Sequence, residues 1–323
     1  MLESRKNLKF IIAIAGAVGI LCLGFWLLTV VANRTVMKKP VSTRNTEIET
    51  RISPIPNKVM VQSSPLANPG ENYNSAQGSS TKNIIVKPTL GLKGFSETMP
   101  ILMYHYIEVA PATTTLKGLY LDPKIFANQL SELQKNNYKT LFMAEVGASI
   151  VSEKKLDQKN IALTFDDGYE DFYTEAYPLL KKYNSKATLY VIINALDKPG
   201  YLTRAQVREL ADSGLVEIAS HTFNHPDLRS LKAKDARFEI MDSKKLLETI
   251  SGKPVLSFAY PYGYYKSEFF DIASSTGYTS AVSVMPGSLQ GTGDQWLIRR
   301  LRPNDRSGQT FIAWIQDWEK SNY

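Results

Sequence analysis

The sequence predicts an α/β fold over residues 99–323, in which helices cover a mostly parallel sheet or barrel. Short β-rich runs alternate with amphipathic helical patterns along this region, as expected of folds built from consecutive strand and helix units. A length of about 225 residues suits a single barrel-like domain. The apolar share of 43% supplies a sizeable core and excludes a chain that is disordered throughout.

Residues 10–32 predict a transmembrane helix. The run holds 23 residues without a charge, and about 20 apolar residues in a helix cross the hydrocarbon core of a bilayer. Arg5, Lys6 and Lys9 lie just before it, so the positive-inside rule predicts a cytoplasmic tail at residues 1–9 and the rest of the chain outside the cell. We expect an uncleaved signal anchor, with a protein secreted after signal cleavage as the alternative.

Residues 33–98 predict a disordered stalk, because small and polar residues dominate them and few large apolar residues are present. The net charge of +7 belongs to this end of the chain, since residues 1–98 hold 12 basic and 5 acidic residues whereas residues 99–323 hold 26 of each. A neutral main domain argues against nucleic acid as a partner, because phosphate neutralisation supplies much of that affinity. The basic end is expected at a lipid membrane or wall surface. The single cysteine, Cys22, excludes an intramolecular disulfide.

The elements of the predicted domain follow from the periodicity of its apolar residues and from the residues that begin and end helices. The predicted strands are residues 100–106, 161–166, 187–193, 215–220, 255–260, 278–284 and 296–301. The predicted helices are residues 122–137, 170–184, 203–213, 233–251, 266–276 and 309–318. In such folds the reactive side chains follow the carboxyl ends of the strands, so polar clusters at those ends are the candidate site.

The strand at 161–166 ends in two adjacent carboxylates, Asp166 and Asp167, followed by Gly168. Two close carboxylates resist simultaneous ionisation unless a cation offsets their repulsion. Gly168 lets the backbone turn tightly enough for the two side chains to face different directions. A plain turn is the alternative interpretation of Asp-Asp-Gly taken alone.

All three histidines of the chain lie on or just after predicted strands. His221 and His225 are four residues apart, and in a helical turn this spacing places both imidazoles on one face, where they suit a divalent transition metal. His105 lies on the first strand of the domain, and its ordinary pKa of about 6.5 makes it a candidate proton donor at neutral pH. A core histidine is the alternative interpretation of His105.

The turn at residues 257–263 reads Ser-Phe-Ala-Tyr-Pro-Tyr-Gly. It is either a tight turn beneath an aromatic core or the wall of a groove on which sugar rings stack. In the second interpretation Tyr262 contacts substrate and its backbone N–H faces an oxyanion.

Taken together, three motifs resemble one known family. TFDDG at 164–168, HTFNH at 221–225 and AYPYG at 259–263 are similar to the motifs of the polysaccharide deacetylases of carbohydrate esterase family 4, the NodB homology domain. The resemblance covers residues 100–300 and implies a distorted (β/α) barrel of the NodB type.

The resemblance also implies the roles of the site residues. Asp167, His221 and His225 would hold a divalent metal, most often zinc, and Asp166 would be the catalytic base. A site of two histidines and one carboxylate would suit cobalt, nickel or iron as well.

The chain departs from the family pattern at two points. The pattern has an arginine where Ala259 stands, and it has a late histidine as the acid, whereas no histidine follows His225. The strand around His105 is similar to that of the poly-N-acetylglucosamine deacetylase branch, in which a histidine at the beginning of the domain is the acid. The missing arginine could be replaced from the last predicted strand, by Arg299, Arg300 or Arg302.

The function implied by the resemblance is metal-dependent hydrolysis of N-acetyl groups on a cell-envelope polysaccharide that contains N-acetylglucosamine. Peptidoglycan and poly-N-acetylglucosamine both fit. One alternative is an O-acetyl esterase acting on wall or plant glycans. A second is a catalytically silent wall-binding module, which follows if nothing replaces the missing arginine.

Overall fold

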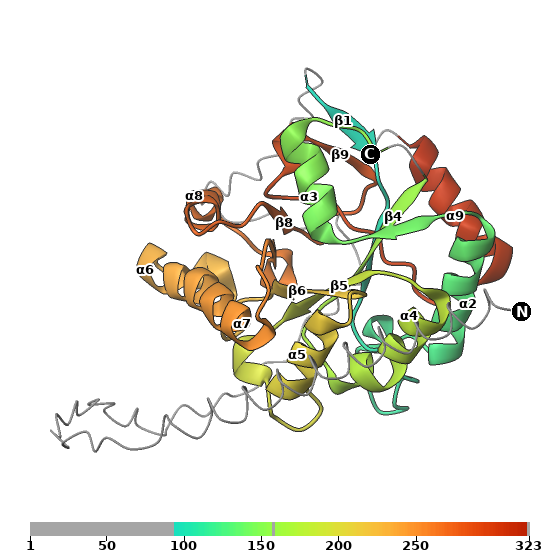
Figure 1. Ribbon diagram of the computed structural model, residues 1–323, viewed down its shortest axis with the longest axis horizontal. Helices are drawn as coiled ribbons and strands as arrows, with labels where there is room; N and C mark the ends of the chain where they lie inside the picture. Colours follow the sequence, from blue (N-terminus) through green and yellow to red (C-terminus); the bar gives the residue numbers. More distant parts are fainter. Residues whose placement is uncertain (1–93, 157–158, 322–323) are drawn as a thin grey trace, which may run out of the picture. The chain divides into compact units, whose positions relative to one another are not determined.

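The structure, a computed structural model, describes residues 94–156 and 159–321, which form a curled parallel sheet with helices packed around it (Figure 1). The predicted transmembrane segment at 10–32 and the predicted stalk as far as residue 93 lie outside the described residues. Within the described part, no helix combines the length and the apolar character that crossing a bilayer requires.

A seven-stranded sheet forms the centre of the domain. Its strands are β2 (Ile101–Tyr104), β3 (Lys139–Leu141), β4 (Asn160–Phe165), β5 (Ala187–Val191), β6 (Val216–Ser220), β7 (Ser257–Ala259) and β8 (Ser280–Val282). The order is β2-β4-β5-β6-β7-β8, β3 also pairs with β4, and all pairings are parallel. The sheet curls into a half-barrel, which confirms the predicted α/β class.

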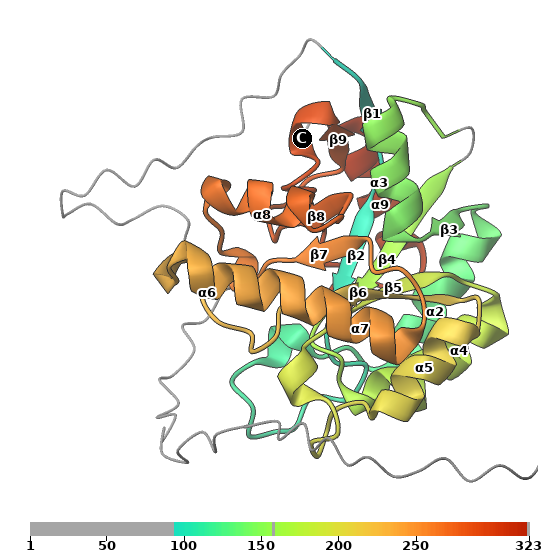
Figure 2. The ribbon, with the colours of Figure 1, turned by 60° about the vertical axis from the view of Figure 1, so that its left-hand side comes forward.

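Helices connect the parallel strands, as parallel pairing requires. They are α2 (Pro123–Lys135), α3 (Met143–Ser152), α4 (Tyr177–Tyr183), α5 (Arg204–Asp212), α6 (Ala233–Arg237), α7 (Ser243–Ser251) and α8 (Phe270–Ser275), and α9 (Gly308–Lys320) follows the last strand. The six predicted helices are confirmed, with π turns at Phe172–Ala176 before α4 and at Phe238–Asp242 between α6 and α7. The Asp122 carboxylate accepts a hydrogen bond from the Lys124 N–H and caps the N-terminus of α2. Figure 2 shows α4, α5 and α7 along the outside of the sheet.

The prediction of a continuous strand at 296–301 is wrong. This segment forms two single parallel bridges, from Ile298 to Val282 of β8 and from Leu301 to Leu102 of β2. A segment that changes its pairing partner midway cannot keep one ladder. It instead connects the two edge strands of the half-barrel.

A second, antiparallel sheet pairs β1 (Ser96–Thr98) with β9 (Leu289–Gly291). β1 lies inside the predicted stalk, so the boundary predicted at residue 98 is wrong. The Glu97 carboxylate of β1 accepts a hydrogen bond from the Leu156 N–H at 2.8 Å. Because these partners are far away in the sequence, the local composition that predicted the stalk gave no sign of them.

β3 and α3 are additional elements that the periodicity did not predict. α3 packs against β4, β7 and β8. At its N-terminus the Met143 N–H donates to the Thr188 hydroxyl at 2.9 Å, and the Ala144 N–H donates to the Glu217 carboxylate at 3.2 Å. Thr188 and Glu217 stand near the beginnings of β5 and β6. α3 therefore covers the end of the sheet where the strands begin, opposite the end where the polar motifs lie.

Alternation along the strands decides which side chains face the interior of the half-barrel. Ala162 of β4 and Ile298 of the connecting segment belong to the buried cluster inside the sheet, together with side chains of α3. Asp166 and Arg300 follow them at even spacing and face the same interior. The fold thus directs two side chains from distant parts of the sequence toward one another.

Candidate active site

Asp166 follows β4, is almost fully buried and forms an ion pair with Arg300. The two terminal nitrogens of the Arg300 guanidinium donate to its two carboxylate oxygens at 2.7 and 2.8 Å, a bidentate geometry. The Arg300 Nε donates to the Ser283 carbonyl at 2.9 Å, which fixes the guanidinium plane. Burial would raise the pKa of Asp166, but the charge and hydrogen bonds of Arg300 outweigh burial and hold the pKa well below its usual range. Asp166 is therefore ionised at neutral pH.

The structure shows which arginine replaces the one that the family pattern has at Ala259. Of the three candidates only Arg300 pairs with Asp166. Arg299 faces the Asp294 carboxylate at 3.9 Å instead. Ala259 itself lies in the same interior cluster as Ile298, which is two residues before Arg300.

Asp167, His221 and His225 converge, with one ligand atom of each within 4.8 Å of the others. The Asp167 Oδ1 lies 3.4 Å from the Nε2 of His221 and 3.5 Å from the Nε2 of His225. Asp167 and His225 have φ values of 77° and 60°, left-handed conformations that turn their side chains out of the extended direction. The structure thus brings the predicted metal triad together. The two histidines lie in a loop after β6, not in the helical turn considered from their spacing.

These three residues fit a divalent transition metal. The His221 Nδ1 lies 2.9 Å from the Ala259 carbonyl oxygen, which makes Nδ1 the protonated nitrogen and leaves the Nε2 lone pair facing the cluster. Burial, and then the neighbouring His221, lower the pKa of His225 to about 4, so this imidazole is neutral at pH 7 as a ligand must be. Two imidazoles and a carboxylate are ligands that zinc accepts.

His105 directly follows β2 at the same end of the sheet and is partly buried. Burial lowers its pKa, and the charges of Asp166 and Asp167 act in the opposite direction. The predicted proton donor therefore lies within electrostatic reach of both carboxylates.

Tyr262 stands at the mouth of the site, on the turn after β7, and is 44% exposed. Its ring packs edge-on against His225, with 4.5 Å between the ring centroids. The turn requires glycine at the next position, because a Cβ on Gly263 would approach Val284 to 2.3 Å. Tyr262 thus borders the metal triad, as the prediction of a substrate contact requires.

A row of stacked tyrosines was not predicted as a unit. The Tyr106 ring stacks on Tyr120 with 4.3 Å between centroids and on Tyr169 with 3.7 Å, and Tyr201 lies 5.1 Å beyond Tyr169. Burial and then the charge of Asp167 raise the pKa of Tyr169, which places the row beside the metal triad. The signal in the sequence is that Tyr106 is next to His105 and Tyr169 lies two residues after Asp167.

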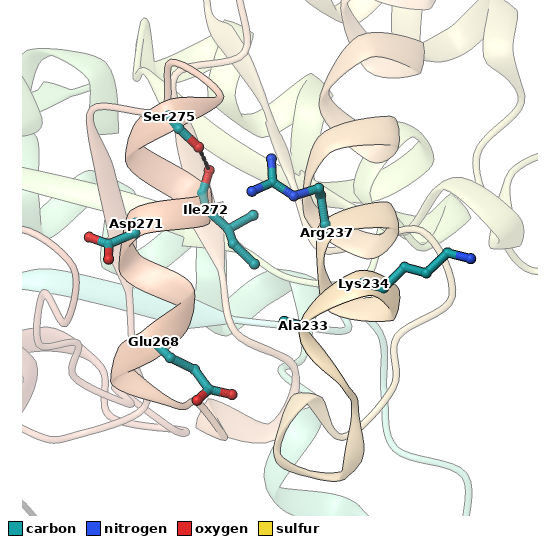
Figure 3. Close-up of a pocket in the computed structure, with 7 residues that line it drawn as sticks. All are labelled: Ala233, Lys234, Arg237, Glu268, Asp271, Ile272 and Ser275. Carbon is teal, nitrogen blue, oxygen red and sulfur yellow. Dashed lines mark hydrogen bonds between the residues drawn. The ribbon is translucent and has the colours of Figure 1, made fainter.

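A cavity of about 520 Å³ lies away from this site, between α6 and the segment that contains α8 (Figure 3). It is lined by Ala233, Lys234, Arg237, Glu268, Asp271, Ile272 and Ser275. None of the predicted site residues lines it, so we assign it no part in catalysis.

Replacing His221 by Ala is expected to abolish both metal binding and turnover, because its Nε2 is one of the three ligand atoms. The measurement is metal content after dialysis, by mass spectrometry, together with acetate release. His105→Ala is the matched control, since it removes a site histidine outside the triad and should keep the metal. Full metal content in His221→Ala would contradict the assignment of the triad.

Comparison with known proteins identifies the family. A family model described as polysaccharide deacetylase matches residues 153–281. YxkH of Bacillus subtilis (strain 168), which is named as a polysaccharide deacetylase, is 35% identical over 219 residues, covering 68% of this chain and 76% of its own length. The chain belongs to the polysaccharide deacetylase family.

Two further similarities extend this result. A poly-β-1,6-N-acetyl-D-glucosamine N-deacetylase of Staphylococcus aureus (strain MRSA252) is 22% identical over 228 residues, 67% of this chain and 77% of its own length. The solved structure of the Streptococcus pyogenes deacetylase PplD in complex with acetate is 30% identical, has a TM-score of 0.63 and covers 68% of this chain and 97% of its own. As a polysaccharide deacetylase the chain is a hydrolase, which confirms the predicted enzyme class and the NodB-like fold.

Proposed function

We propose that this polysaccharide deacetylase removes N-acetyl groups from an N-acetylglucosamine polysaccharide of the cell envelope with the aid of a divalent metal. The observation that carries the proposal is the convergence of the metal triad, Asp167, His221 and His225, beside the ionised carboxylate of Asp166. The relative that is named as a poly-β-1,6-N-acetyl-D-glucosamine N-deacetylase supports the same class of substrate.

Each group in the site has one role in the proposed reaction. Asp166, held ionised by Arg300, is the base that accepts a proton from the attacking water. His105 donates a proton to the leaving amine, and the Tyr262 backbone N–H donates to the oxyanion of the tetrahedral intermediate. A divalent ion held by the triad supplies Lewis acidity toward the acetamide carbonyl and toward water. Zinc is the metal we propose, because its preferred ligands match the triad, with cobalt, nickel and iron as outcomes of the metal analysis.

The presence of Arg300 supports a catalytic function over a silent wall-binding module. That alternative depended on the absence of an arginine at Ala259, and a bidentate partner for Asp166 removes its basis. The O-acetyl esterase alternative becomes an outcome of the test below.

The test is acetate release by the full chain in mild detergent from two substrates in parallel, β-1,6-linked N-acetylglucosamine oligomers and purified peptidoglycan. We expect release from at least one of them, and loss of release after treatment with a chelator. Restoring activity with zinc would identify a sufficient metal. No release from either substrate by a metal-loaded protein would overturn the proposal and turn attention to acetyl esters.

We further propose that residues 10–32 anchor the protein in the cell membrane with the deacetylase domain outside. This proposal rests on the charge-free run and on the basic residues before it. Fractionation should recover the full chain with membranes and a variant lacking residues 1–32 without them. Recovery of a shortened mature chain in the medium would instead show signal cleavage.

A further inference from the structure

Arg302 lies at the edge of the candidate site on a segment whose backbone is fixed. The preceding residue, Leu301, accepts from the Met103 N–H of β2 at 2.9 Å. On the other side, the buried Gln129 side chain donates to the carbonyls of Asn304 and Arg306 at 3.1 and 2.7 Å. The position of Arg302 is therefore set by the fold on both sides and does not depend on its own side chain.

The Arg302 guanidinium has no hydrogen bond and no ion pair with any residue in the described ranges 94–156 and 159–321. The two nearby carboxylates already have partners. Both oxygens of Asp166 accept from Arg300, and the Asp167 Oδ1 faces the imidazoles of the metal triad. Burial, and then the charge of Arg300, lower the pKa of Arg302, while the charges of Asp166 and Asp167 act in the opposite direction.

Arg302 also faces the catalytic residues. Together with His105, Tyr106 and Tyr120 it lines a cavity of about 20 Å³, which holds roughly one water molecule. A sugar ring cannot enter such a space. The rings of Tyr106 and Tyr120 stack nearly parallel, at 7°, and make a flat wall beside the guanidinium. A phosphate or a carboxylate is also larger than one water molecule, so a group recognised by Arg302 contacts this partly exposed side chain from outside the cavity.

We propose that Arg302 forms a subsite for an anionic substituent, a phosphate or a carboxylate, carried by the polysaccharide close to the N-acetylated sugar. The inference rests on the proposed function and narrows its substrate to glycans that bear negative charge. A guanidinium donates two parallel hydrogen bonds to either anion, so the chemistry of the subsite is the same for both.

The experiment uses three tetramers of β-1,6-linked N-acetylglucosamine: neutral, phosphorylated on one secondary hydroxyl, and carboxymethylated on one secondary hydroxyl. Binding to the full chain is measured by calorimetry and acetate release by a coupled assay. We expect the wild type to bind at least one anionic tetramer about tenfold more tightly than the neutral one, as charge-assisted hydrogen bonds provide. Arg302→Gln should reduce this preference to about twofold or less. If the wild type prefers only one of the two anionic tetramers, the anion on that tetramer is the substituent that Arg302 recognises.

Two control variants keep the test specific. Arg229→Gln removes a cation that is already paired with Asp227 at 2.7 Å and should keep the anion preference. Arg302→Lys keeps the positive charge and should retain part of the anion preference. Thermal melts verify that each variant is folded. Equal binding of all three tetramers by the wild type, or an unchanged preference in Arg302→Gln, would overturn the subsite. Tight binding of an anionic tetramer without acetate release from any substrate would overturn the proposed function and leave the subsite standing.

Discussion

Replacing Arg300 by Gln is expected to lower the free energy of unfolding by about 3 to 5 kcal/mol, the usual cost of removing one partner of a buried ion pair. Both Asp166 and Arg300 are almost fully buried, so the remaining carboxylate would have no solvent to replace the two lost hydrogen bonds. Denaturant unfolding at pH 7 measures the effect. A change below about 1 kcal/mol would show that Arg300 does not stabilise the charged carboxylate.

The same variant should change the pH dependence of stability and activity. In the wild type the pKa of Asp166 is lower in the folded state than its ordinary value of 3.8, so the pair stabilises the fold above pH 3.8 and that stabilisation is lost as the pH falls further. Without Arg300, burial raises the pKa instead. Asp166 would then bind its proton at higher pH, and activity in Arg300→Gln should fall as the pH is lowered through a range where the wild type is unaffected.

A double variant separates the two effects of this change. Arg300→Gln combined with Asp166→Asn replaces the ion pair by two neutral side chains, so no charge is left buried without a partner. We expect it to recover much of the stability lost in Arg300→Gln but none of the activity. Recovery of activity would exclude Asp166 as the base.

Replacing Asp166 by Asn alone is expected to lower turnover by about a hundredfold to ten-thousandfold, the range that a general base contributes. Asn preserves the size of the side chain but cannot accept the proton of the attacking water. Because Asp166 lies outside the metal triad, the variant should keep its metal, in contrast to His221→Ala. Acetate release and metal content are measured on the same preparation.

The control for this variant must separate the loss of the base from the effect of an unpaired Arg300 on folding. Asp166→Asn leaves that guanidinium buried without an anion, so a melting curve must show that the variant is folded at the assay temperature. Turnover close to that of the wild type in a folded, metal-loaded Asp166→Asn protein would overturn the assignment of the base.

The grouping of Asp166, Asp167, His221 and His225 at one end of the sheet could be predicted from the sequence, because each lies in a short motif just after a strand. The roles assigned to them, three metal ligands and a base, came from the resemblance to the deacetylase family. The choice of Arg300 could not be predicted. Three arginines stand within four residues, and only the direction of the segment after Ile298 decides which of them faces the interior.

Two elements that were not predicted, β1 and α3, are stabilised by partners that are distant in the sequence. β1 is held by β9 and by the contacts of Glu97, and α3 begins where Thr188 and Glu217 accept its first N–H groups. Neither feature changes the local hydrophobic periodicity from which strands and helices can be predicted. The prediction of a strand at 296–301 is wrong for the opposite reason. The apolar residues of this segment pack like those of a strand, but the segment does not form one continuous ladder.

The Asp166–Arg300 pair joins residues 134 positions apart. Contacts so distant in sequence are costly to form, because a long loop must close first. Asp166 has its cationic partner only when the segment that holds Arg300 lies between the two edge strands, so the ionised state of the base depends on closure of the half-barrel.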